Sequence, residues 1–200
     1  MIPYKFTASV CLIFAAGCCF AQGYTIKGHV KGVDTGWAYI RHRQRIGTDS
    51  GKIVSGNFMI TGKVEDPEFC AFGLAINGKK DYYLSLFLAP NNLTLSVDTA
   101  SLNDIGIHLT GSRVELQFQQ FQSVVAQTNR LHLTEIARSK KLEQLASSYA
   151  LQHHNSYIGA FAIFSYEKDQ GKLSKLFNAL SREVRHSYFG QKIAQNLNSR

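Results

Sequence analysis

The body of this chain contains almost no cysteine. Four cysteines occur in 200 residues, and Cys11, Cys18 and Cys19 all lie close to the N-terminus. Cys70 therefore has no second thiol nearby in sequence, so no C-x-x-C pair is available for a dithiol redox cycle. A lone cysteine in the apolar run Phe69–Phe72 is typical of a small buried hydrophobic side chain.

The sequence also lacks the short motifs of common catalytic sites. Neither a G-x-S-x-G nucleophile turn nor a glycine-rich phosphate loop occurs along the chain. The acids that would have to pair in a glycosidase stand mainly at predicted turns, as Asp34, Asp49, Asp66 and Asp104 do. We therefore predict a protein that is not an enzyme, with no catalytic residue and no cofactor.

Histidine is more frequent, with seven residues, but its arrangement does not favour a metal site. His153 and His154 are adjacent, so on a helix their side chains point about 100° apart and do not converge on one ion. The nearest acid on that side of the chain is Glu143. We predict no metal ligand and interpret the pair as a polar helix end.

Charged residues make up only 18% of the chain, although the net charge is +8 and the pI about 9.4. The basic residues are scattered, with one modest cluster at Arg41, His42, Arg43 and Arg45. A nucleic-acid-binding face needs basic side chains gathered on one stripe with aromatic residues between them. We predict no nucleic-acid partner, and the 44% of apolar residues is enough for a real core.

The N-terminus has the pattern of a secretory signal peptide over residues 1–21. Lys5 precedes the uncharged stretch Phe6–Phe20, which is too short to span a bilayer comfortably as a helix. Cleavage after Ala21 would use Cys19 and Ala21 as the small residues two apart, and the mature chain would begin at Gln22. This predicts a periplasmic or secreted protein.

A second interpretation of the same segment stays open. Ala15-Ala16-Gly17-Cys18 is similar to a lipobox, with Ala15 in place of the usual Leu. Cys18 would then become a diacylated N-terminal residue, and the protein would be a membrane-anchored lipoprotein. Contact with a membrane is predicted only in this case.

From residue 22 to residue 111 the pattern is typical of short strands. Apolar residues recur two apart, which places them on one face of a sheet. Asn77-Gly78 between two apolar runs predicts a hairpin, and further turns are predicted at Asp34–Gly36, Asp49–Gly51, Ser55–Asn57 and Pro90–Asn92. About eight strands at this spacing predict an antiparallel β-sandwich or open barrel. The alternating segments lie at Tyr24–Val30, Trp37–Tyr39, Phe58–Ile60, Leu84–Leu88, Leu93–Val97 and Ile105–Leu109.

Residues 112–200 change to helical periodicity, which makes the fold class α+β. Ser112-Arg113-Val114-Glu115 predicts a capping box at the start of the first helix. A second helix is predicted from about Thr134 to Gln152 and a third from Ser156, with Gly171 as a break. A short amphipathic helix then carries Leu173 to Leu180, and a last turn or two covers Tyr188 to Leu197.

The order of these features resembles one protein family. The features are the Gly28 strand, the Asp49-Ser50 turn, Val54-x-Gly56-x-Phe58-x-Ile60-x-Gly62, Pro67, the Phe87-Leu88 strand, Thr110-Gly111-Ser112, Asn155–Ile158 and Ser187-x-x-Gly190-x-x-Ile193. Together they are similar to the domain of unknown function DUF4369, over essentially all of Gln22 to Leu197. In Bacteroidetes this domain precedes an AhpC/TSA or thioredoxin-like domain, and the resemblance itself carries over no catalytic residue.

The resemblance leads to three hypotheses. Since the sequence ends at Arg200, where the thioredoxin fold would begin, the first is a non-enzymatic cell-envelope accessory protein that binds another protein or a copy of itself. The second is a β-sandwich that binds a small ligand or glycan, with stacking faces at Trp37, Tyr39, Tyr82 and Tyr83. The third is a remnant of a thiol–disulfide oxidoreductase that lacks its catalytic domain.

Two surface features remain as candidates. The aromatic residues of the helical tail could form a contact surface, although packing against the sandwich explains most of them better. They are Phe161, Phe164, Tyr166, Phe177, Tyr188 and Phe189. Asp98-Thr99-Ala100 resembles a short O-glycosylation motif of exported proteins, with Thr99 as the acceptor.

Overall fold

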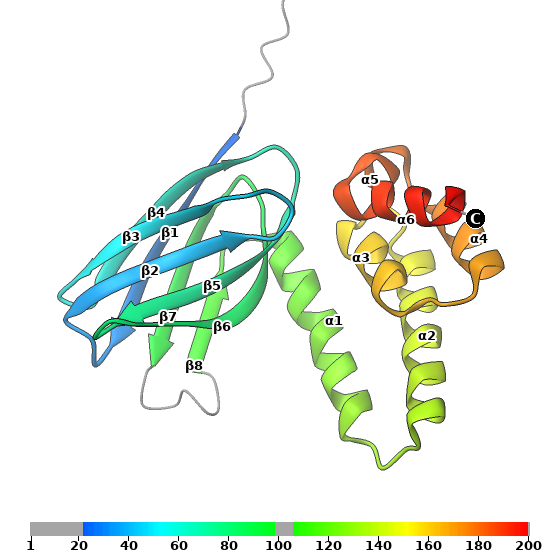
Figure 1. Ribbon diagram of the computed structural model, residues 1–200, viewed down its shortest axis with the longest axis horizontal. Coiled ribbons are helices and arrows are strands. Elements are labelled where there is room, and N and C mark those ends of the chain that lie inside the picture. Colours follow the sequence, from blue (N-terminus) through cyan, green and yellow to red (C-terminus); the bar gives the residue numbers. More distant parts are fainter. Residues whose placement is uncertain (1–21, 99–105, 200) are drawn as a thin grey trace, which may run out of the picture.

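The computed structural model describes residues 22–98 and 106–199, and within them strands precede helices (Figure 1). Residues 1–21, the predicted signal peptide with Cys18, and the proposed acceptor Thr99 lie outside the described residues. The strands are β1 (Gln22–Lys31), β2 (Thr35–His42), β3 (Thr48–Val54), β4 (Asn57–Val64), β5 (Glu68–Ile76), β6 (Lys79–Leu88), β7 (Asn92–Asp98) and β8 (Gly106–Thr110). The helices are α1 (Arg113–Arg130), α2 (Glu135–Gln152), α3 (Tyr157–Tyr166), α4 (Gln170–Ala179), α5 (Arg182–His186) and α6 (Tyr188–Asn198).

All eight strands form one curved sheet that nearly closes into a barrel, in the order β6-β5-β2-β3-β4-β1-β7-β8. The α+β class, an open barrel followed by a helical region, is confirmed. The sheet is mixed rather than purely antiparallel, because β1 and β7 run parallel. β6 and β8 are its edge strands, and α1 contacts both of them.

Two tight hairpins follow directly from the sequence. Asn77 and Gly78 both have positive φ, 51° and 78°, and connect β5 to β6 as the Asn-Gly pair predicts. Ser55 and Gly56, at 49° and 77°, connect β3 to β4 in the same way. These turns suit the right-handed twist of the strands they join, so the register of both hairpins is fixed locally.

Two strands were not anticipated by the alternation pattern. Asp49–Gly51 was expected to be a turn but lies inside β3, where it pairs with Ala38–Ile40 of β2. β5 is apolar almost throughout because it is covered on both faces. Its inward residues Cys70, Phe72 and Leu74 enter the barrel core, while outward Phe69 packs against the helices.

The barrel interior is filled by its own side chains. Tyr24, Ile26, Ile40, Ile60 and Phe72 are each at most 2% exposed and belong to one contiguous cluster. Packing at this density leaves the inside of the barrel as a core and not as a ligand cavity. Binding chemistry must therefore be sought at the ends or on the outside of the described part of the barrel.

The first three helices start where the sequence predicts, and their caps explain why. Ser112, Thr134 and Ser156 each accept a hydrogen bond from a backbone N–H of the first turn of α1, α2 and α3. Gly171 does not break the chain as expected, since α4 starts one residue earlier behind the cap Asp169. The sequence pattern also missed α5, and α6 is a full helix of 11 residues rather than a turn or two.

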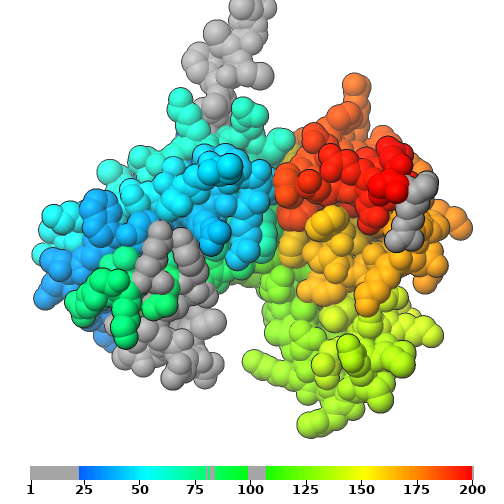
Figure 2. Space-filling view, viewed as in Figure 1, coloured from blue at the N-terminus to red at the C-terminus, as the bar shows by residue number. Residues whose placement is uncertain are grey.

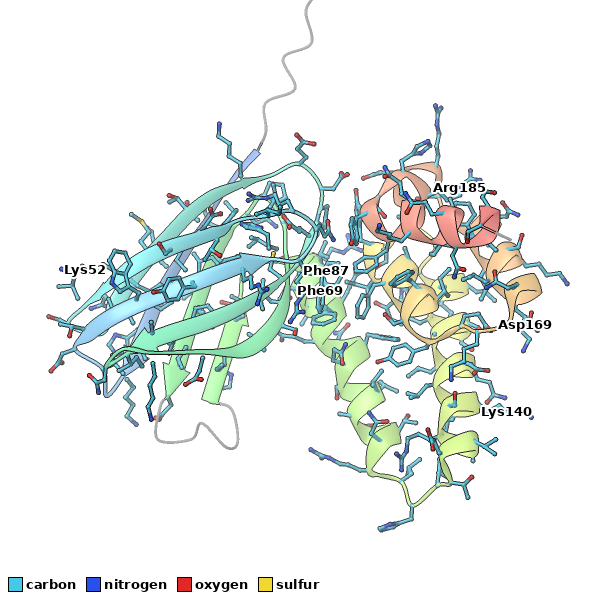
Figure 3. All side chains as sticks on the ribbon, viewed as in Figure 1. Lys52, Phe69, Phe87, Lys140, Asp169 and Arg185 are labelled. Carbon is cyan, nitrogen blue, oxygen red and sulfur yellow. The ribbon has the colours of Figure 1, made fainter. Side chains whose placement is uncertain are left out.

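An aromatic cluster joins the barrel to the helices. Phe69 of β5 and Phe87 of β6 project from the side of the barrel that faces the helical region (Figure 3), with ring centroids 5.5 Å apart. Both rings contact Phe118, Phe161 and Phe189 of α1, α3 and α6 at 5.1–6.4 Å. The two halves of the chain thus share one hydrophobic cluster.

Glu115 adds a polar contact to this apolar joint. Its carboxylate accepts a hydrogen bond from the backbone N–H of Phe87 at 2.6 Å and another from the Gln119 amide at 3.0 Å. The expected return contact of the capping box is thus replaced by a bond to the edge strand β6. Burial raises the pKa of Glu115 from 4.5 to about 7, although both hydrogen bonds oppose the shift.

Glu115→Gln should make the protein less sensitive to pH. Because the carboxyl pKa is raised in the folded state, its contribution is complete below about pH 4.5 and is lost as the pH rises through about 7. The wild type should lose about 3 kcal/mol between these values relative to the glutamine variant. Urea unfolding of both proteins at pH 5 and pH 8 measures this difference. Parallel pH profiles would contradict it.

Glu115→Ala is the matched control for the hydrogen bond itself. Alanine leaves the buried Phe87 N–H without an acceptor, which should cost about 1–3 kcal/mol. Glutamine retains an acceptor oxygen, and its NH₂ group can donate to Gln119 once that amide turns. The alanine variant should therefore be the less stable of the two at every pH.

Candidate functional site

A polar cluster lies inside the end of the barrel that faces α5 and α6. His42 at the end of β2, Asp49 of β3 and Glu68 at the start of β5 form its centre. Tyr24 of β1 and Arg45 of the β2–β3 loop contact Asp49, and the Cys70 thiol completes the cluster. We refer to these six residues as the His42 cluster.

The His42 imidazole is held between two carboxylates. Nδ1 lies 3.0 Å from Oε2 of Glu68, and Nε2 lies 3.0 Å from Oδ2 of Asp49. The side chain of His42 is fully buried, that of Glu68 is 6% exposed and that of Asp49 25% exposed. Burial lowers the pKa of His42, but the hydrogen bonds to both carboxylates outweigh it, so the pKa is raised overall.

Tyr24 and Gly62 fix the position of Asp49. The Tyr24 hydroxyl donates to Oδ2 of Asp49 at 2.5 Å. Gly62 is the cross-strand partner of Tyr24, and a Cβ at this position would lie 2.1 Å from the same Asp49 oxygen. The absence of a side chain at residue 62 therefore makes room for the carboxylate.

Arg45 covers the cluster from the solvent side. Its Nη2 atom lies 2.7 Å from Nε2 of His42 and 3.6 Å from Oδ2 of Asp49. Its Nε atom lies 3.6 Å from Oε2 of Glu68. With 45% of its side chain exposed, Arg45 is the most accessible member of the ion pairs. When His42 is protonated, two positive and two negative groups balance within the cluster.

Within the described part of the chain, only one of the two carboxylate oxygens of Glu68 has a polar partner. Oε2 contacts His42 and Arg45, whereas Oε1 is buried and has no hydrogen-bond partner. A buried acceptor without a partner carries a desolvation cost that no hydrogen bond compensates. Oε1 thus keeps its capacity to accept a hydrogen bond or to coordinate a cation.

A surface groove of about 780 Å³ runs past the cluster between the barrel and the last helices. Figure 2 shows the red C-terminal helices against the cyan loops of the barrel, at the same junction. Arg45, Asp49 and Glu68 line one side, and His186, Tyr188 and Gln191 of α5 and α6 line the other. The cluster is thus reached from solvent through a groove that both parts of the chain form.

The Cys70 thiol is not activated in this setting. It is fully buried, and its Sγ lies 3.7 Å from Nδ1 of His42. Burial, and next the negative charge of Glu68, raise its pKa, so it is held as a neutral thiol. A nucleophilic cysteine needs the opposite shift.

The predicted candidates fall in different places. Cys70 is buried as predicted, but beside polar groups as well as apolar ones. Trp37 is 46% exposed on the outer face of β2, and Tyr39, two residues further along the same strand, is half-buried. The side chains of Tyr82 and Tyr83 are not among those that the structure describes. His153 and His154 are exposed at the end of α2.

Most of the tail aromatics pack inside the helical region. Phe161 and Phe189 are each 8% exposed, and Tyr166, Phe177 and Tyr188 are partly buried against the same cluster. Phe164 alone among the six counts as exposed, at 42%. Packing was the preferred interpretation for most of these residues, and their burial agrees with it.

Sequence reasoning missed the His42 cluster. The sequence pattern places His42 in a basic cluster and Asp49 at a turn, and it assigns no role to Glu68. One usable signal was present, because Glu68 and Cys70 are two apart and therefore share a face of β5. Their meeting with His42 depends on the pairing of β2 with β5, where His42 stands opposite Cys70.

Residues 24–118 match the family model of a domain of unknown function, DUF4369. The match covers the strands and the first turns of α1. A search of curated proteins finds no significant match. Among the described residues, no helix combines the length and the apolar character needed to cross a membrane.

Cys70 should resist alkylation in the folded protein. Because the thiol is buried and its pKa is raised, an alkylating reagent at pH 8 should leave it unmodified while the same reagent labels it rapidly in guanidinium. Peptide mass mapping follows Cys70 separately from the N-terminal cysteines. Rapid labelling in the native state would show an accessible, activated thiol instead.

Proposed function

Because residues 24–118 form a DUF4369 domain, a family defined without an activity, we propose that this chain is a non-enzymatic cell-envelope accessory protein that binds another protein through its helical region. The signal-like pattern of residues 1–21 supports export, by ordinary secretion or by lipidation at Cys18. The filled barrel and the unactivated Cys70 thiol both agree with a binding role.

The observation that carries this proposal is the exposed apolar tip of the α1–α2 hairpin. Val124 in the second half of α1 and Leu131 directly after its end are each 42% exposed, and Ile136 in the first turn of α2 is 81% exposed. Figure 1 shows that this end of the hairpin projects away from the barrel and from α3–α6. Covering such side chains stabilises a complex by about 25 cal/mol per Å² of apolar surface.

A second candidate function rests on the outer face of β2. Trp37 stands half-exposed there and pairs across the strands with Lys52 of β3. An indole face beside a lysine is suited to stacking on a sugar ring that carries an acidic group. Binding of an acidic glycan is therefore the alternative to a protein partner.

Ile136 should give a specific cross-link in the native envelope. A photo-reactive amino acid at position 136 should yield one discrete adduct, because the proposed partner covers the hairpin tip. Met59, an apolar residue that is 56% exposed on the barrel, is the matched control position and should yield none. The adduct mass distinguishes a partner from a second copy. Adducts of equal yield from both positions, or from neither, would contradict the proposal.

Trp37 allows the glycan alternative to be tested directly, because it is the only tryptophan of the chain. A glycan that stacks on β2 should change the tryptophan emission, and Trp37→Ala should weaken its binding by about 0.5–1.5 kcal/mol. Fluorescence titration with neutral and acidic oligosaccharides measures the first effect, and calorimetry the second. Unchanged emission with every sugar would contradict the glycan-binding alternative.

A further inference from the structure

Three buried donor atoms of different chemistry converge in the His42 cluster. Nδ1 of His42, a carboxylate oxygen of Glu68 and Sγ of Cys70 all lie within 4.8 Å of one another. All three residues are at most 5% exposed. We propose that they bind a divalent transition-metal ion, and that Zn²⁺ is the ion that this donor set fits best.

The unpartnered oxygen of Glu68 points independently to a bound group. Oε1 is buried without a hydrogen bond, although the same carboxylate already contacts His42 through Oε2. A purely structural ion pair gains nothing from an orphaned acceptor, whose desolvation is uncompensated. Coordination of a cation by this carboxylate supplies the missing partner.

The spacing of the donors suits tetrahedral coordination. Zinc–sulfur and zinc–nitrogen bonds of roughly 2.3 and 2.0 Å place the two ligand atoms about 3.6 Å apart. Sγ of Cys70 and Nδ1 of His42 are 3.7 Å apart, and Nδ1 and Oε2 of Glu68 are 3.0 Å apart. Both separations are close to those between two ligand atoms of one tetrahedral ion.

The other side of the imidazole is arranged as metal-binding histidines require. Nε2 of His42 lies 3.0 Å from Oδ2 of Asp49, and the Tyr24 hydroxyl holds that carboxylate. With Nδ1 as the metal ligand, Nε2 carries the proton and donates to Asp49 once the Arg45 guanidinium, 2.7 Å from Nε2, has moved away. A carboxylate on the second ring nitrogen fixes the ring orientation and makes the ligating nitrogen more basic. Nδ1 is then the nitrogen that faces Glu68 and Cys70.

The donor set also selects the kind of ion. A thiolate, an imidazole and a carboxylate suit Zn²⁺, whereas Ca²⁺ and Mg²⁺ prefer oxygen ligands alone. On binding, the Cys70 thiol proton and any proton on Nδ1 pass to solvent. The thiolate and the carboxylate then balance the two charges of the ion, and three protein ligands leave a fourth coordination position open.

Arg45 borders the proposed position and must move when an ion binds. Its guanidinium contacts Nε2 of His42 at 2.7 Å, and its Nε lies 3.6 Å from Oε2 of Glu68. The side chain is 45% exposed, so it has room to move towards solvent when a cation arrives. The groove lined by Arg45, Asp49 and Glu68 provides the route of entry.

Cobalt titration of the chelator-treated full-length chain tests the proposal. Co²⁺ should bind one per chain, with a thiolate-to-cobalt charge-transfer band in the near ultraviolet and the strong visible absorption of a tetrahedral site, and Zn²⁺ should displace it. Cys70→Ser should abolish the charge-transfer band. Asp49→Asn, which weakens the support of His42 without removing a proposed ligand, should weaken Co²⁺ binding about tenfold or more.

Two matched controls separate this site from other candidates. The triple variant C11S, C18S and C19S should retain the band, since these cysteines lie outside the barrel sequence. The double variant H153A and H154A should retain it as well. Glu68→Gln, checked for folding by circular dichroism, should weaken binding even if Cys70→Ser does not fold. A band that persists in folded Cys70→Ser protein, an unchanged Co²⁺ affinity in folded Glu68→Gln protein, or no Co²⁺ binding by the folded wild type would overturn the proposal.

Discussion

The start of β5 holds the two parts of the molecule together, because its alternating side chains serve both. Phe69 points outward into the aromatic cluster of the helices, while Glu68 and Cys70 point inward into the His42 cluster. A shift of one residue in the pairing of β5 would exchange these faces. β5 pairs Phe69 with Phe87 of β6 on one side and Cys70 with His42 of β2 on the other, so both clusters depend on its position in the sheet.

The helices cover part of the outer surface of the barrel and one of its edge strands. They cover the outer face of β5 with aromatic rings, and aromatic pairs of this kind contribute about 0.5–1.5 kcal/mol each beyond burial. Glu115 of α1 also satisfies a backbone N–H of β6, an edge strand. An uncovered edge of this kind is open to pairing with other chains. The α1 helix thus satisfies part of an edge that the sheet alone leaves open.

The sequence predicted local structure better than it predicted the site. Strands with one buried face show a clear alternation, and serine or threonine caps mark three of the helix starts, so these elements were found. β5 was missed because helices cover its second face and remove the alternation. Asp49 was taken for a turn residue because its type favours turns. Its carboxylate instead accepts from Tyr24, 25 residues earlier in the chain, a contact that no local pattern encodes.

Stability alone does not account for the His42 cluster. Burying an imidazole between two carboxylates carries a desolvation cost, and apolar replacements of buried ion pairs are often neutral or stabilising. The rest of the barrel interior is filled by apolar side chains that pack without such a cost. The ionic groups also lie at the groove, where Asp49 and Arg45 reach solvent, and not at the centre of the core. A cluster placed at the surface opening, with one carboxylate oxygen unpaired, is better explained by the proposed metal binding than by stabilisation of the fold.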